Sequence, residues 1–463
     1  MSATARIVYG AGPWPRDIVK WRLGDPRLAL SILELHLKSP EWIHHRLHQI
    51  TFHDDTTVRH CFTVDLTVPP QAPPLRVFQA QEIRLLPLDL LRKQNLVNFE
   101  ICDQEGQSLS YFTRIQLGSL TSVILIKYAE GLLDEPLPDE IVMFIQKLAA
   151  RDSANAQASQ DTWANMTFAN PSVQAVKDRL SRMVEFTSIL KRFINNIILL
   201  TPTNAPPGTR LKMRYCLDVP IEPFLEAEPE EGLLEKLGWR STHIDFPLQA
   251  AADTEIYHFE VEDPPGVDLA MAAILEYPES ANGSPQRPII RDWQPGGLPR
   301  LNLRAVGVQQ GSVVAARVDF RSSRQGWLPR FMACSWVVAL LLLIGAWRLP
   351  YMLDLGRQTE GTDPVGVAAA VLVFLSGVMA TLLAKSDEHG LTRKLLSRLR
   401  LLASVTAALP GAAVAALLFI PPGPLRWTWL GLAVGALLAA ILSTISYAFP
   451  KIPKPLIPLE ALT

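Results

Sequence analysis

The stretch WLPRFMACSWVVALLLLIGAW, residues 327–347, decides the architecture of this chain, because it is the first of four long apolar runs. The other three follow in the last third of the chain, at Pro364–Ala384, Leu401–Ile420 and Leu425–Phe449. About 20 helical residues at ~1.5 Å each cross the ~30 Å hydrocarbon layer of a bilayer. The pattern predicts a C-terminal region of four transmembrane helices behind a large water-soluble region.

The four runs contain very few ionisable side chains. Arg330 lies near the start of the first run and Arg426 at the edge of the fourth, and no other Lys, Arg, Asp, Glu or His falls within them. A charge at the centre of a membrane helix costs about 2.5–3.5 kcal/mol, so this composition is typical of helices that face lipid. The lipid bilayer is therefore the first expected partner.

Lysine and arginine are concentrated in the flanks that an even number of crossings places on one side. They are Arg317, Arg321, Arg324 and Arg330 before the first run, Lys385, Arg393, Lys394, Arg398 and Arg400 between the second and third, and Lys451 and Lys454 in the tail. By the positive-inside rule, both termini are expected in the cytoplasm of a multi-pass protein of the inner or plasma membrane. The start, MSATARIVYGAGPWPRD, has no apolar core of signal-peptide length, which agrees with that orientation.

The connection KSDEHGLTRKLLSRLRLL has a pattern of its own. Its leucines can share one helical face while Arg393, Lys394, Arg398 and Arg400 project elsewhere, which suits contact with an anionic membrane surface. The alternative is an ordinary positive loop that extends the third helix.

Small residues in the apolar runs indicate close helix packing. Gly431 and Gly435 form a G-x-x-x-G step, Gly411 begins a similar step in the third run, and Pro410 is expected to kink that helix. These residues predict packing within one bundle or, alternatively, self-association between protomers.

The composition bounds the functional class. The net charge of -1 over 463 residues argues against general binding of nucleic acid. The four cysteines, Cys61, Cys102, Cys216 and Cys334, are far apart and form no C-x-x-C pair, so no disulfide is expected and a reducing compartment is favoured.

The fold class predicted for the front of the chain is α+β, with antiparallel, sandwich-like β units. We expect a mainly helical segment over residues 1–56, a small β unit over 57–117, a helical section over 118–207 with one long helix from Pro171, and an antiparallel sandwich-like domain over 208–322. Residues 323–463 are expected to form the transmembrane domain and a short cytoplasmic tail. The last strand of the sandwich leads almost directly into the first apolar run.

One group of side chains has the composition of a metal site. If residues 40–50 are helical, His44 and His48 lie one turn apart with Glu41 on the preceding turn, which suits zinc. Surface or packing histidines are the alternative, and no other cofactor is expected. The phosphate-binding, G-x-S-x-G and catalytic-cysteine patterns are missing, so an enzyme is less expected than a binding protein.

Three tryptophans in loop-like contexts, Trp163, Trp239 and Trp293, are candidates for binding a protein or small-molecule partner, although a structural role at the core edge is the commoner one. The preferred hypothesis is a cytoplasmic sensing or interaction module joined to a four-helix membrane element, which acts as an oligomeric pore-forming or membrane-perturbing effector. The alternatives are a membrane-anchored scaffold without pore activity and a membrane-bound enzyme whose site is assembled from distant residues.

Overall fold

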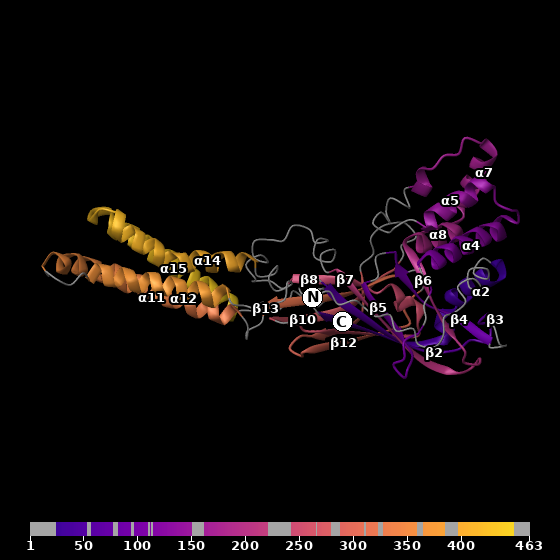
Figure 1. Ribbon diagram of the computed structural model, residues 1–463, viewed down its shortest axis with the longest axis horizontal. Helices are drawn as coiled ribbons and strands as arrows, with labels where there is room; N and C mark the ends of the chain where they lie inside the picture. Colours follow the sequence, from indigo (N-terminus) through magenta and orange to yellow (C-terminus); the bar gives the residue numbers. More distant parts are fainter. Residues whose placement is uncertain are drawn as a thin grey trace.

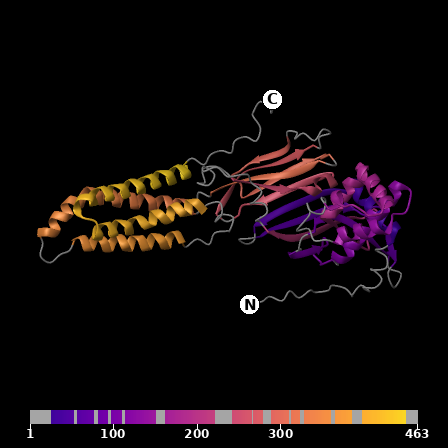
Figure 2. The same cartoon turned by 90° about the horizontal axis from the view of Figure 1, so that it is seen from above.

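The structure, a computed structural model, has a soluble α+β region and, beyond one end of it, a bundle of long helices (Figures 1 and 2). It describes residues 25–52, 57–76, 82–93, 97–109, 112, 114–150, 162–220, 242–264, 266–278, 288–309, 312–322, 327–358, 364–384 and 397–448.

A six-stranded sheet runs through the soluble region in the order β12-β9-β1-β2-β7-β5. All its pairs are antiparallel except β1 with β9. The strands are β1 (Ile43–Phe52), β2 (Thr57–Thr67), β5 (Val97–Cys102), β7 (Arg210–Pro220), β9 (Ile256–Glu262) and β12 (Arg300–Val306). Segments predicted as separate β units, residues 57–117 and 208–322, therefore contribute strands to one sheet.

The helix predicted over residues 40–50 is wrong. Helix α2 (Pro26–Leu37) is capped by the Asp25 side chain, and α3 (Ser39–Trp42) is a single turn that passes directly into β1. The alternation typical of a strand is present, but two of its buried positions hold Arg46 and His48 instead of apolar residues. A polar side chain at a buried position hides the period of two from a reading of hydrophobicity.

A three-stranded sheet and a group of helices enclose the first hydrophobic core. The sheet consists of β3 (Pro74–Arg76), β4 (Glu82–Arg92) and β6 (Asn196–Thr203) in the order β3-β4-β6, and the helices after α3 are α4 (Arg114–Leu133), α5 (Asp139–Ala150), α7 (Pro171–Arg182) and α8 (Val184–Asn195). The single long helix predicted from Pro171 is divided at Met183, whose backbone is extended. Of the strand predicted after the turn at Gly106, the structure shows one β-bridge from Ser108 to Cys102, and α4 begins at Arg114.

A four-stranded sheet faces the other end of the six-stranded sheet and encloses a second core. Its order is β11-β10-β13-β8, from β8 (Thr242–Pro247), β10 (Val267–Tyr277), β11 (Ile289–Pro295) and β13 (Val313–Ser322). All six strands predicted after residue 208 are present, and β11 is an additional one. Side chains of β11 also cover the edge of β12: Gln294 accepts a hydrogen bond from the backbone N–H of Asn302, and Asp292 accepts one from that of Arg304.

The C-terminal helices are α11 (Trp327–Gln358), α12 (Pro364–Ala384), α14 (Ser397–Phe419) and α15 (Pro422–Ala448). Among the described residues, three stretches are long and apolar enough to cross a bilayer: Leu328–Tyr351, Arg400–Phe419 and Pro424–Ala448. The apolar stretch described in α12 is shorter, Ala369–Met379. The prediction of four spanning helices is thus supported for three of them.

Hydrogen bonds join these helices in two pairs. The Trp336 indole donates to Thr444 Oγ1 at 2.8 Å and the Trp429 indole donates to the Leu342 carbonyl at 2.9 Å, which ties α11 to α15. Ser376 of α12 donates to the Ala407 carbonyl of α14 at 2.5 Å. That carbonyl precedes Pro410 by three residues, in the turn where a proline disturbs backbone bonding.

The helix glycines have different surroundings. A methyl group at Gly345 would come within 2.8 Å of the Trp429 ring, and one at Gly411 would lie 3.9 Å from Ser376 Oγ. A methyl group at Gly431 or Gly435 would have no atom within 4 Å. The G-x-x-x-G step is therefore an open surface of α15, whereas Gly345 permits close contact between α11 and α15.

We expect Gly345→Ala to destabilise the helical bundle by about 1–3 kcal/mol, because the added methyl group forces the Trp429 indole out of its place. Gly431→Ala is the matched control, since it adds the same group to another helix glycine where there is room. Thermal unfolding of the full chain in detergent, followed by tryptophan fluorescence, measures both. Equal midpoints for the two variants would contradict the packing described here.

Candidate functional site

A cluster of buried polar side chains lies where the two hydrophobic cores meet on the inner face of the six-stranded sheet. Strand β1 contributes Ile43 to the first core and Ile50 to the second, and β2 runs the opposite way, from Val58 in the second core to Val64 in the first. The cluster fills the positions between them with Arg46, His48 and His60.

An ion pair joins the six-stranded sheet to the three-stranded sheet. Arg46 Nη1 lies 2.6 Å from Asp89 Oδ2, and Arg46 Nη2 donates to the Leu88 carbonyl at 2.6 Å. The Tyr215 hydroxyl also donates to Asp89. Burial raises the pKa of Asp89, while Arg46 opposes that effect by favouring the carboxylate. Arg46 is fully buried and Asp89 is 6% exposed, so each charge depends on the other for compensation.

A second chain of polar contacts continues toward the second core, between the six-stranded and four-stranded sheets. His48 Nδ1 lies 2.9 Å from the Tyr257 hydroxyl, and His48 Nε2 lies 2.9 Å from His60 Nδ1. The Phe62 ring stacks on His48 at 4.1 Å and on Tyr215 at 4.8 Å, so it links this chain to the Arg46–Asp89 pair. Burial lowers the pKa of His60 to about 4 and that of His48 as well, which leaves both rings neutral at pH 7.

A third polar group, in which Asp253 is buried and Arg192 is partly exposed, borders the first core. Arg192 of α8 binds both carboxylate oxygens of Asp253, at 2.6 and 2.7 Å, and Asp253 ends the short helix η3 (Gln249–Asp253). Burial lowers the pKa of His36 to about 4, although the nearby Asp253 opposes this. Helices of the first core are thereby tied to the segment that leads into the sandwich.

The composition of this cluster is suited to a structural connection between the two cores. Arg46, His48, His60, Asp89, Tyr215 and Tyr257 are each less than a tenth exposed. Hydrogen bonds and ion pairs between such groups are directional and leave little freedom in how the surrounding strands are aligned, because an unpaired buried polar group is costly. The cluster is suited to hold two cores in one relative arrangement and to couple a change in one to the other.

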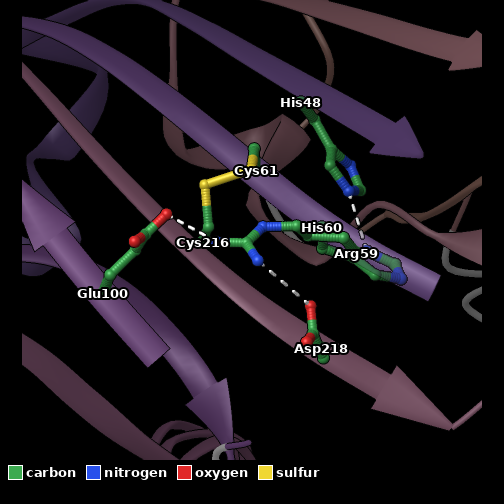
Figure 3. The surroundings of a disulfide bond; sticks show 7 residues. All are labelled: His48, Arg59, His60, Cys61, Glu100, Cys216 and Asp218. Atoms are coloured by element: carbon green, nitrogen blue, oxygen red, sulfur yellow. Dashed lines mark hydrogen bonds and ion pairs between the residues drawn. A yellow bond between two sulfur atoms is a disulfide. The ribbon is translucent and has the colours of Figure 1, made fainter. Parts of the chain in front are cut away.

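The opposite face of the same sheet carries a disulfide, which the spacing of the cysteines in the sequence did not predict (Figure 3). Cys61 of β2 and Cys216 of β7 are directly opposite in the antiparallel register, with Cα atoms 4.1 Å apart, and their sulfur atoms are bonded. The expectation of unpaired cysteines is wrong, and the preference for a reducing compartment loses its basis. A sequence separation of 155 residues hid the pair, since only the strand pairing brings the two cysteines together.

Charged groups surround the disulfide. Arg59 lies 2.5 Å from Glu100 of β5 and 3.9 Å from Asp218 of β7, as the dashed lines of Figure 3 mark. The Asn98 side chain donates to Asp218 at 2.5 Å, from a backbone with φ of 48° beside a bulge in β5. Bulges of this kind redirect side chains, and here the bulge places Asn98 and Glu100 over the neighbouring strands.

The residues predicted to bind a metal ion do not lie close together. Because residues 43–52 form a strand, His44 and His48 are separated by roughly 13 Å along it. His44 contacts Thr67, His48 belongs to the buried cluster, and Glu41 lies in α3. Within the described ranges, no group of three or more His, Cys, Asp and Glu side chains is arranged to hold a metal ion.

The tryptophans predicted to bind a partner differ in their exposure. Trp163 is 6% exposed and packs near Phe144 and Phe186, so its indole belongs to the first core and is not a recognition surface. Trp239 lies outside the described residues. Trp293, on the edge strand β11, is 51% exposed and stays a candidate.

The predicted membrane-surface cations are placed only in part. Arg393 and Lys394 fall outside the described residues. Arg398 and Arg400 lie in the first turn of α14, where the Arg400 side chain is half-buried.

Comparison with known proteins gives no relative from which a role can be transferred: no family model matches the chain, and no curated protein is significantly similar to it.

We expect Asp89→Ala to lower the free energy of unfolding of the soluble region by about 3–5 kcal/mol, since it leaves the Arg46 guanidinium buried without its counter-charge. Glu262→Ala is the control, because its partner Arg300 is 53% exposed and water can replace the carboxylate. Urea unfolding of both variants measures the difference. A loss under 1 kcal/mol for Asp89→Ala would contradict a structural role for the pair.

The buried imidazoles predict a loss of stability in acid. His36 is neutral in the folded protein down to about pH 4, whereas in the unfolded chain it takes up a proton below about pH 6.5. Its contribution is therefore full above pH 6.5 and decreases by up to about 3 kcal/mol as the pH falls to 4. His36→Phe should make the unfolding free energy less dependent on pH in this window. Parallel pH profiles for the two proteins would contradict the prediction, and other titrating groups cancel in the difference.

Proposed function

We propose that this is an integral membrane protein in which a soluble sensing or interaction module controls a four-helix membrane element. In its active form the membrane element opens a pore or perturbs the bilayer. The observation that carries the proposal is the short connection between them: four residues separate Ser322, the end of β13, from Trp327, the start of α11.

The place of β13 supports mechanical coupling. It pairs with β10 on one side and β8 on the other, so it cannot shift without the sheet. Its inward side chains Val314, Ala316, Val318 and Phe320 belong to the second core, which adjoins the buried polar cluster. A connection this short transmits a displacement, whereas a long flexible linker absorbs it.

On the membrane side, the same displacement reaches more than one helix. Helix α11 is bound to α15 through Trp336 and Trp429, and α12 is bound to α14 through Ser376. Movement of one pair against the other is the change we propose for the bundle. Near the soluble region, Leu328, Phe331 and Ala403 bring the starts of α11 and α14 together. Tyr447, near the end of α15, packs against the same cluster. Helices that start and end on one side, together with the 21 residues of α12, support four crossings.

The distribution of Lys and Arg supports an orientation with both termini in the cytoplasm. A disulfide in that compartment is usually transient, catalytic or redox-sensing, so the Cys61–Cys216 pair supports redox state as one input to the module. The open Gly431–Gly435 surface of α15 supports self-association of the membrane element.

Reconstitution into dye-loaded liposomes tests the proposal. We expect the full chain to release dye, and we expect a variant with about 12 Gly/Ser residues inserted after Ser322 to lose control of release by the soluble module, since such a linker is flexible. The insertion lies between β13 and α11 and changes no residue of either, so an effect on release reports on the connection and not on folding.

Liposomes that stay intact under both oxidising and reducing conditions would contradict pore activity and favour the scaffold alternative. Release that is identical with and without the insertion would contradict coupling through β13. Size measurement in detergent reports separately on self-association.

A further inference from the structure

Three cysteines, not two, share one face of the six-stranded sheet. Glu100 of β5 is opposite Cys216, and Cys102 is opposite Arg214, two residues before Cys216 on β7. Because side chains alternate along a strand, Cys102 projects to the same face as Glu100 and the disulfide. The ion pair between Glu100 and Arg59 fixes the direction of that face. Cys102 is thus a diagonal neighbour of Cys216 across β7 and β5.

The three sulfur atoms differ in access. Cys61 is 6% exposed and Cys216 is 1% exposed, whereas Cys102 is half-buried and carries no disulfide. A soluble thiol or disulfide therefore reaches Cys102 more readily than either member of the bond. Cys102 is also the last residue of β5, directly before the turn with Gly106 at φ of 77°, and the edge of it that faces away from β7 forms a single β-bridge with Ser108.

We propose that Cys102 is the exchange partner of the Cys61–Cys216 disulfide, through which low-molecular-weight thiols and disulfides set its redox state. The Cys102 thiolate attacks Sγ of Cys216, a Cys102–Cys216 bond forms, and Cys61 leaves as a thiolate that takes up a proton. An external thiolate such as glutathione then attacks Cys102, which leaves Cys216 as a thiolate and Cys102 in a mixed disulfide. A second glutathione thiolate releases Cys102 as glutathione disulfide forms, and the two electrons end on Cys61 and Cys216.

A Cys102–Cys216 bond requires a small local movement of β5. Diagonal neighbours lie about 7–8 Å apart between Cα atoms, and a disulfide usually needs about 4.4–6.8 Å. The end of β5 must therefore approach β7 by about 1–2 Å, as the same spacings require. The matching approach of Cys102 to Cys61 is blocked, because β7 lies between β5 and β2.

Charge around Cys102 slows the exchange at neutral pH. Burial, Glu100 and Asp103 raise the pKa of the Cys102 thiol, and Arg214 on the facing strand opposes them. Since the thiolate is the attacking species, the rate is expected to increase with pH.

Two single variants of the full chain in detergent form a matched test. Each is oxidised with glutathione disulfide and its bonds are mapped by mass spectrometry. In Cys61→Ser, we expect Cys216 to pair with Cys102. In Cys216→Ser, Cys61 and Cys102 are two strands apart, and we expect about tenfold less bonding between them, because disulfide geometry is restrictive. Both variants lose the same native bond, so their folding is equally affected.

Unpaired Cys216 in the Cys61→Ser variant, or equal bonding in both variants, would overturn the proposal. If neither variant folds, the rate of reduction by glutathione is compared between the wild-type chain and Cys102→Ser. We then expect reduction about tenfold slower in the variant, and Cys334→Ser serves as the control. Equal rates would overturn the proposal by this second route. The inference does not depend on pore activity, so loss of dye release leaves it unaffected.

Discussion

The ion pair between Arg46 and Asp89 is the interaction on which the arrangement of the soluble region depends. A guanidinium and a carboxylate with almost no access to water are tolerated only together, and each is further held by a backbone or tyrosine partner. Because Arg46 lies on β1 and Asp89 on β4, the pair fixes one sheet over another. The histidine chain from His48 then extends this fixed point to the sandwich.

The two faces of β2 therefore serve different purposes. The inner face carries His60 and Phe62 into the buried cluster, and the outer face carries Arg59 and Cys61 toward charged groups and the disulfide. Neighbouring residues of this one strand therefore lie in two environments, the buried cluster and the charged outer face. A change in the sulfur chemistry on one face can thus alter strand pairing at the cluster on the other, and this is the route by which the proposed redox input would act on the soluble module.

Much of the fold was predictable from the sequence, and the failures have specific causes. Long apolar runs and strands with apolar alternation, such as those from Arg210 and Val313, were found because burial leaves a periodic trace. Strand β1 was missed because Arg46 and His48 occupy its buried positions, and α8 was merged with α7 because the break at Met183 has no glycine or proline. The disulfide and the Arg46–Asp89 pair could not be predicted, since each joins residues that only the strand order brings together.

The parallel pairing of β1 with β9 has a consequence for how the chain is made. β1 begins at Ile43 and cannot find this neighbour until Glu262 has been synthesised, and the outermost strand of the sheet ends at Val306. Only 20 residues, 307–326, then separate the completed sheet from the start of the apolar helix α11. The ribosome therefore delivers the final strands and the first apolar helix almost together, so under the proposed membrane role the globular part would still be maturing when α11 enters the bilayer.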